Sequence, residues 1–324
     1  MINNITFIVG NGLDISLGLE TKYVDFYTYI QKNNGPAADN QIYKAIAKDP
    51  DTWADFEKAL GVHTQVIEET LRGKNRVEAS KRLHKAFDEV LSDLGDYLQE
   101  QVAQSSDRIP LYTMDYKDFY AGLPGELSRM ITSSLKIPVN MGFITLNYTD
   151  TLERMLINRQ TMLRRGIRIS QIHHAHGELS QYITMGVSNE SQLSAALQGD
   201  SRDDLIKPRL LKSMQDGRLS TTMSIIDRSD VIVLFGTSYG ATDEYIWQYV
   251  IEWLKASEDR LIILHDYNPE YMQKPTRNPS RIKQLDNEAR SRLLEHAGVL
   301  GDGEEVELRA RILVVRNTNK LFKG

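Results

Sequence analysis

Short runs of consecutive apolar and β-branched residues recur along the chain. They predict strands at residues 5–9, 142–147, 168–173, 182–187, 230–236, 260–266 and 311–316. Most of these runs are apolar at successive positions, which is typical of strands covered on both faces, as in a parallel sheet flanked by helices. Apolar residues that return every three or four positions predict helices, for example from Leu83 to Leu98 and from Tyr245 to Leu254. The pattern predicts an α/β fold whose mostly parallel sheet is flanked by helices.

More than a hundred residues follow the first predicted strand before a second convincing one begins. They are rich in helix formers and charged residues, and they are too numerous for a single crossover between neighbouring strands. We therefore predict a Rossmann-like nucleotide-binding core made of residues 1–19 and 139–324. Residues 20–138 are predicted to form a large helical insertion subdomain after the first strand.

Composition and charge exclude several classes of protein. The 324 residues include no cysteine, which rules out disulfides, thiolate catalysis and thiolate zinc or iron–sulfur sites. The formal net charge of −5, spread over interspersed acidic and basic residues, argues against a constitutive nucleic-acid surface. No apolar run approaches the roughly 20 residues that span a bilayer, and no basic export signal opens the chain. We therefore expect a cytoplasmic protein that has no membrane segment.

The first predicted strand runs directly into the glycine-punctuated turn Gly10-Asn11-Gly12-Leu13-Asp14. A strand that enters a Gly-x-Gly turn and then a helix is how doubly wound α/β folds begin, and there the turn holds the phosphates of a nucleotide. The glycines allow a ligand to approach closely, and the backbone N–H groups of the Gly10–Gly12 turn and of the helix after it are expected to face a diphosphate. The third glycine of the dinucleotide fingerprint is replaced by Ile15, so a turn that binds nothing is the alternative.

Polar or glycine residues follow three other predicted strands, at the ends where open α/β sheets bind ligands. These ends are Asn147-Tyr148, His173-His174-Ala175-His176-Gly177, and Gly236-Thr237-Ser238-Tyr239-Gly240 followed by Asp243. Asn147 has an alternative interpretation as the cap of a helix that starts near Thr149. On a strand His174 and His176 share a face while His173 points away, so we expect no metal site. His176, at a strand end, can reach an open pocket as a base or a hydrogen-bond donor.

Four segments together resemble the AbiH family of bacterial phage abortive-infection proteins. They are Gly10–Asp14, Gly18–Phe26, Trp53–Glu57 and Thr145–Glu153, and they follow one another in the family's order. More distantly, the Gly-x-Gly turn, the Thr-x-Asn-Tyr segment, His176-Gly177 and the late Gly-x-Ser segment with its following aspartate resemble the sirtuin-like fold. The resemblance implies a Rossmann-like (sirtuin-like) core and a role in antiphage defence.

The sirtuin-like resemblance further implies an antiphage effector that binds NAD and hydrolyses its nicotinamide–ribose bond, as an NAD glycohydrolase does. Asn147 and His176 correspond to the catalytic pair, and His176 either accepts the proton of the attacking water or binds the ribose. The residues implied to bind the nucleotide are Gly10, Asn11, Gly12, Asp14, Thr21, Tyr148, Gly177, Gly236, Ser238, Asp243 and, by position near the adenosine ribose, Asn268. NAD is then a substrate, and no metal is expected. The absence of the sirtuin four-cysteine zinc module disfavours protein deacylation.

Several alternatives stay open at this level. A cleft that holds NAD or ADP-ribose without cleaving it would make the protein a sensor or scaffold in a defence system. The expected partners are the nucleotide, a phage-derived or host trigger, and further copies of the chain in a homo-oligomer. The Trp53–Glu57 segment either packs within the helical insertion or brings Asp55 or Glu57 over the cleft.

Overall fold

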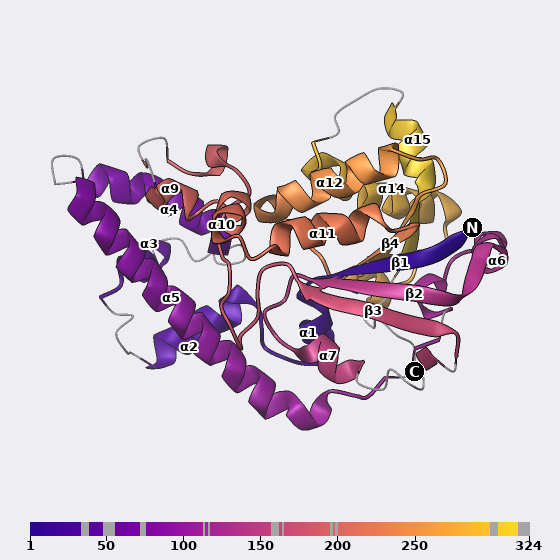
Figure 1. Ribbon diagram of the computed structural model, residues 1–324, viewed down its shortest axis with the longest axis horizontal. Helices are drawn as coiled ribbons and strands as arrows, with labels where there is room; N and C mark the ends of the chain where they lie inside the picture. The colour runs from indigo at the N-terminus through magenta and orange to yellow at the C-terminus, as the bar shows by residue number, and fades with distance from the viewer. Residues whose placement is uncertain are drawn as a thin grey trace.

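A parallel sheet lies between two layers of helices (Figure 1). The computed structural model describes residues 1–33, 39–47, 56–71, 76–112, 114–115, 117–156, 162–163, 165–194, 197, 200–298 and 304–316. Within these residues the strands are β1 (Ile2–Val9), β2 (Leu135–Thr145), β3 (Ile167–His174), β4 (Val231–Phe235), β5 (Leu261–Asp266) and β6 (Ile312–Arg316). Their order is β3-β2-β1-β4-β5-β6, and each neighbouring pair is parallel. The predicted α/β fold with a parallel sheet is confirmed.

One face of the sheet packs against α1 (Gly12–Ser16), α6 (Gly125–Ser134) and α7 (Thr151–Met155). Phe7 and Val9 of β1 lie in the hydrophobic cluster on this face, where Phe7 stacks on Phe143 with ring centroids 4.8 Å apart. Successive residues of a strand point to opposite faces. Ile8 therefore lies in the cluster on the other face, which is why β1 is apolar at consecutive positions.

The second face is covered by the helices that follow the later strands. They are α11 (Arg218–Asp227), α12 (Glu244–Lys255), α14 (Pro279–His296) and α15 (Glu304–Arg311). Figure 1 shows α11, α12 and α14 on the opposite side of the sheet from α1 and α7. The predicted helix across Tyr245–Leu254 is confirmed by α12.

A third hydrophobic cluster lies beside the sheet and is built mainly by helices between β1 and β2. The helices of this part are α2 (Tyr23–Asn33), α3 (Gln41–Ile46), α4 (Phe56–Leu71) and α5 (Arg76–Ser105), with short turns at Ser106–Arg108 and Asp118–Tyr120. The cluster also takes in Tyr148, Met185 and Val187, so these helices share their core with segments after β2 and β3. The division into residues 20–138 and the rest stays a prediction. No described helix has both the length and the apolar content needed to cross a bilayer.

The remaining short helices carry the chain between β3 and the end. They are Glu190–Gln192, α9 (Asp200–Asp203), α10 (Lys207–Met214), Ala241–Asp243 and α13 (Pro269–Gln273). In Figure 1, α9 and α10 lie beside α4, at the same side of the molecule as the third cluster.

One predicted strand is wrong, because residues 182–187 do not join the sheet. They form isolated bridges instead, between Gly177 and Ile183 and between Val187 and Ile206. Met185 and Val187 are buried in the third cluster against helices. An apolar run buried by helices has the same pattern as a fully buried strand, and periodicity alone does not separate the two. The second strand was also predicted too short, since β2 begins at Leu135 and not at residue 142.

The strand order reverses between β1 and β4, and there the backbones of two turns touch. The N–H of Gly10 donates to the Phe235 carbonyl at 2.9 Å, and the N–H of Gly12 donates to the Gly236 carbonyl at 2.8 Å. A Cβ atom on Gly12 would lie 2.4 Å from the Gly236 Cα atom, which is far inside van der Waals contact. Gly236 has φ +65°, a conformation that favours glycine. Both turns therefore require glycine for this packing.

We predict that Gly12→Ala lowers the free energy of unfolding by about 2–3 kcal/mol, because the new methyl group overlaps backbone that cannot rotate away. Gly95→Ala is the matched control: Gly95 lies in α5, and a Cβ there would meet nothing within 4 Å. That variant should keep or gain stability, by at most about 1 kcal/mol. Urea unfolding of both proteins measures the difference, and equal midpoints would contradict the account of this contact.

Candidate functional site

A cleft of about 1550 Å³ opens at the carboxyl ends of the strands, over the point where the strand order reverses. Its floor includes the turns after β1 and β4. One wall comes from the ends of β2 and β5, and residues of the helices between β1 and β2, such as Tyr23 and Glu57, form another part. This is the position at which open α/β sheets bind ligands.

The structure brings most of the predicted site residues together in this cleft. Those that line it are Gly10, Asn11, Gly12, Asp14, Thr21, Asn147, Tyr148, His176, Gly236, Ser238, Asp243 and Asn268. Gly177 is not among the lining residues. Its φ of +86° and the position its Cβ would take, 2.0 Å from the Tyr182 carbonyl oxygen, show that it turns the chain after His176. The binding and catalytic roles of these residues stay predictions.

The expected use of the glycine N–H groups is wrong. The N–H groups of Gly10 and Gly12 are both engaged with carbonyl groups at the end of β4, so neither points to a ligand. Helix α1 is also only five residues long. The glycines instead let two turns share the floor of the cleft, and their missing side chains keep that floor open.

Asn11 and Thr21 bind each other across the mouth of the cleft. The Asn11 amide Nδ2 donates to the Thr21 carbonyl at 2.9 Å, and the Thr21 hydroxyl donates to Asn11 Oδ1 at 2.6 Å. These two bonds tie the turn after β1 to the segment that leads into α2. Both side chains have a structural task here, whether or not they also contact a ligand.

Asn147 does not cap a helix, so that alternative is wrong. Helix α7 begins at Thr151, and Asp150 occupies its cap position. Asn147 is 8% exposed, and its carbonyl accepts a hydrogen bond at 3.0 Å from Nδ1 of His174. The other ring nitrogen of His174 lies 2.8 Å from Glu153 Oε1. Burial alone lowers the pKa of His174, but the Glu153 carboxylate and the Asn147 carbonyl raise it above its ordinary value.

The three neighbouring histidines have different surroundings, and the prediction that His174 and His176 share a strand face does not apply, because β3 ends at His174 and His176 lies in the turn after it. Nε2 of His173 lies 3.1 Å from the Arg218 carbonyl oxygen, on the face away from the cleft. His174 holds the backbone of Asn147. His176 is 3% exposed and lines the cleft.

His176 belongs to a buried network of charges that the sequence did not reveal. Its Nε2 lies 3.1 Å from Asp243 Oδ1 and 3.4 Å from the Tyr245 hydroxyl. Lys207 is fully buried, and its Nζ donates to the same Asp243 oxygen at 2.6 Å and to Glu57 Oε2 at 2.7 Å. The network thus joins four separate segments of the chain at one wall of the cleft.

Burial and charge act in opposite directions on these groups. Burial raises the pKa of Asp243, but Lys207 and His176 outweigh it and hold that pKa below its usual value. For Glu57, burial outweighs Lys207 and keeps the pKa raised. Burial lowers the pKa of Lys207, yet the two carboxylates raise it well above its ordinary value. Asp243 and Lys207 are therefore ionised, and Asp243 already has Lys207 as a cationic partner.

Asp14 is a second buried carboxylate in the cleft, and its surroundings differ from those of Asp243. It is 1% exposed, its Oδ2 accepts a hydrogen bond from the Thr149 hydroxyl at 2.7 Å, and its Oδ1 has no hydrogen-bond partner among the described residues. Burial raises the pKa of Asp14 to about 6, although the polar side chains of Thr149, Thr151 and Asn147 lower it. At neutral pH this carboxylate is ionised but unusually basic.

Two residues of the buried network, Glu57 and Lys207, differ in how far the sequence alone pointed to them. Glu57 is in the Trp53–Glu57 segment, and its place in the cleft favours the alternative in which this segment reaches the site. Trp53 and Asp55 lie outside the described residues. Lys207 follows an apolar pair and precedes a proline, a context that carries no signal of burial, and lysine is almost never fully buried.

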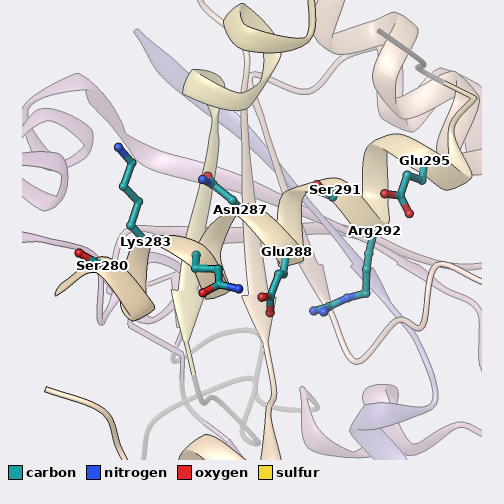
Figure 2. Close-up of a pocket in the computed structure, with 8 residues that line it drawn as sticks. Ser280, Lys283, Asn287, Glu288, Ser291, Arg292 and Glu295 are labelled. Atoms are coloured by element: carbon teal, nitrogen blue, oxygen red, sulfur yellow. The ribbon is translucent and has the colours of Figure 1, made fainter. Parts of the chain in front are cut away.

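A second hollow, of about 680 Å³, lies along α14 (Figure 2). All of its lining residues, from Ser280 to Glu295, belong to this one helix. Figure 2 shows their polar side chains spread along the helix without converging on a common point. The hollow is a solvated helix surface, whereas the cleft at the strand ends gathers groups from many segments.

The family model described as "Bacteriophage abortive infection AbiH" matches residues 6–265. This range includes the second half of β1, all of β2 to β4, most of β5, and the segments that contribute Asn147, His176, Lys207 and Asp243 to the site. The chain therefore belongs to the AbiH family. A comparison with curated proteins gives no match.

We predict that Asp14→Asn stabilises the protein at neutral pH. The pKa of Asp14 is raised in the folded state from 3.8 to about 6, so the folded protein binds the proton more tightly than the unfolded chain does. Ionisation therefore costs stability as the pH rises from about 4 to about 6, by up to about 3 kcal/mol. The asparagine variant should show that gain in urea unfolding at pH 7.5 and little gain at pH 4. A variant less stable than wild type at pH 7.5 would contradict this.

We predict that Lys207→Met lowers the free energy of unfolding by about 3–5 kcal/mol, because Glu57 and Asp243 are left as buried carboxylates without a cation. Lys212→Met is the control, since Lys212 is an exposed residue of the same helix. It should change stability by no more than about 0.5 kcal/mol. Similar losses in the two variants, measured by urea unfolding, would show that the buried network does not have this role.

Proposed function

We propose that this protein is an abortive-infection effector that binds NAD in the cleft at the strand ends and hydrolyses the nicotinamide–ribose bond. Membership of the AbiH family supports the role in phage abortive infection. The observation that carries the enzymatic part is that Asn147 and His176 line the same cleft as the glycine turn of β1, with Asp243 held against His176. Three strand ends and one loop thus supply the chemistry at one place.

The shape and position of the cleft support a dinucleotide as its ligand. Pockets for drug-sized ligands measure roughly 300–1,000 Å³, and a cleft of about 1550 Å³ suits a longer molecule. It lies at the reversal of a sheet with the order β3-β2-β1-β4-β5-β6, which is the order of Rossmann-like dinucleotide-binding folds. Asn268, at the far end beside β5, is then near the adenosine ribose, and the nicotinamide end lies by Asn147 and His176.

The residues of the cleft suit cleavage of a glycosidic bond to a neutral leaving group. As nicotinamide departs, positive charge develops on the ribose, and nearby negative charge stabilises it. Asp243 supplies such a charge, because Lys207 keeps it ionised. Asn147 carries both a donor and an acceptor and orients the water and a ribose hydroxyl without a charge of its own. His176, with Nε2 held by Asp243, presents Nδ1 to the ribose.

We predict that Asn147→Ala and His176→Ala each lower the rate of nicotinamide release from NAD by about 100-fold or more, while circular dichroism stays that of the wild type. Each substitution removes a polar side chain that lines the cleft without touching the sheet contacts. The measurement is chromatographic detection of free nicotinamide after incubation of the purified protein with NAD.

The matched control is His173→Ala. His173 is a neighbouring histidine that contacts α11 and is not among the residues that line the cleft. This variant should keep the wild-type rate. Full turnover by both cleft variants would overturn the assignment of the catalytic pair. A wild-type protein that retains NAD or ADP-ribose and forms no product would instead favour the sensor alternative.

A further inference from the structure

We propose that Asp14 accepts the proton of the water that attacks the ribose, a catalytic role beyond the binding role predicted for it from sequence. The proposal rests on the proposed function, since NAD hydrolysis is the reaction that supplies this water. It separates two tasks at the site, proton transfer by Asp14 and contact with the ribose by His176.

The geometry around Asp14 leaves one carboxylate oxygen available. Oδ2 is occupied by the Thr149 hydroxyl at 2.7 Å, while Oδ1 is buried and has no hydrogen-bond partner among the described residues. Asp14 lines the cleft together with Asn147 and Thr149, which follow β2 on the neighbouring strand. A water held between Oδ1 and the Asn147 amide would satisfy the unpaired oxygen.

An unpaired buried oxygen on a carboxylate is costly, and folded proteins seldom retain one without a reason. The unpaired oxygen belongs here to Asp14, which lines the cleft beside the turn after β1. Strain and unsatisfied groups that persist in a folded protein concentrate at functional sites. The arrangement is typical of a group that is prepared for a ligand or a water.

The two carboxylates of the buried network, Asp243 and Glu57, are less suited to take the proton. Asp243 contacts both Lys207 and His176, so its Oδ1 is already engaged, and the Lys207 cation keeps its basicity low. Glu57 is bonded to Lys207. Among the described residues no cation pairs with Asp14, and Asp150, at the cap position of α7, raises its pKa further. Two carboxylates whose surroundings push their pKa values apart divide into a base and an electrostatic stabiliser.

The step balances as follows. The oxygen of the water forms a bond to C1′ of the ribose while the bond from C1′ to the nicotinamide nitrogen breaks. Both electrons of that bond stay with the nitrogen, and nicotinamide leaves as a neutral molecule. One proton of the water passes to Asp14 Oδ1 and is later released to solvent. NAD and water thus give ADP-ribose, nicotinamide and one proton.

The test compares Asp14→Asn with Asp150→Asn, the same substitution at a neighbouring carboxylate that is half-exposed and bonded to Arg154. Asp14→Asn should lower kcat for nicotinamide release by about 100-fold or more, and it should remove the acidic limb near pH 6 from the profile of kcat/KM. Because Asp150 itself raises the pKa of Asp14, Asp227→Asn is the neutral control: Asp227 is exposed, is bonded to Tyr249 and does not line the cleft. Its dissociation constant for ADP-ribose, measured by isothermal titration calorimetry, should stay within about threefold of wild type. Asp227→Asn should keep the wild-type kcat and binding, whereas Asp150→Asn should move the acidic limb to lower pH, because a charge that raises the pKa of Asp14 is lost. Formate should restore part of the rate of Asp14→Ala by replacing the lost carboxylate.

Two results would overturn the assignment while leaving NAD hydrolysis in place. One is an Asp14→Asn protein that retains the wild-type kcat and pH profile. The other is an Asp14→Asn protein whose affinity for ADP-ribose falls in step with its rate, which would make Asp14 a ligand-binding residue. A wild-type protein that binds ADP-ribose but releases no nicotinamide would contradict the proposed function itself, and Asp14 would then have no proton to accept.

Discussion

The contact between the turns after β1 and β4 is the constraint on which the rest of the structure depends. Two N–H groups of the first turn donate to carbonyl groups at the end of β4, at 2.9 Å and 2.8 Å, and glycine is required on both sides. This contact joins the two halves of the sheet at the point where the strand order reverses. It also leaves an open floor beneath the strand ends, and the cleft exists because no side chain fills that floor.

A buried cation, Lys207, then connects further segments of the chain at the wall of this cleft. Lys207 binds Glu57 from α4 and Asp243 from the loop after β4, and Asp243 in turn holds His176 after β3. Helices from the stretch between β1 and β2 thereby become one wall of the cleft. The cleft contains two carboxylates with opposite character, Asp243 with the Lys207 cation against it and Asp14 with no cation against it among the described residues. The proposed reaction, which develops charge and transfers a proton, depends on this asymmetry more than on any single residue.

Much of the fold was predictable, because strands buried on both faces leave consecutive apolar runs in the sequence. Residues 182–187 misled the prediction for the same reason, since burial by helices leaves the same run. The turn at Gly10–Gly12 was located correctly, but the use of its N–H groups was not, because their acceptors lie more than 200 positions away in the chain. Asn147 and His176 were found through resemblance to a family pattern. Lys207 was missed because its burial depends on two distant carboxylates and leaves no local trace.

The central claim is that the cleft at the reversal of the sheet holds a dinucleotide with its nicotinamide ribose beside Asn147 and His176. A crystal structure of the Asn147→Ala protein with NAD tests it most directly, since slow turnover would preserve the ligand. The account predicts intact NAD in the cleft, with the nicotinamide ribose within hydrogen-bond distance of His176 and the adenosine end toward Asn268. A dinucleotide bound elsewhere on the protein, or in the reverse orientation with adenosine at His176, would contradict it.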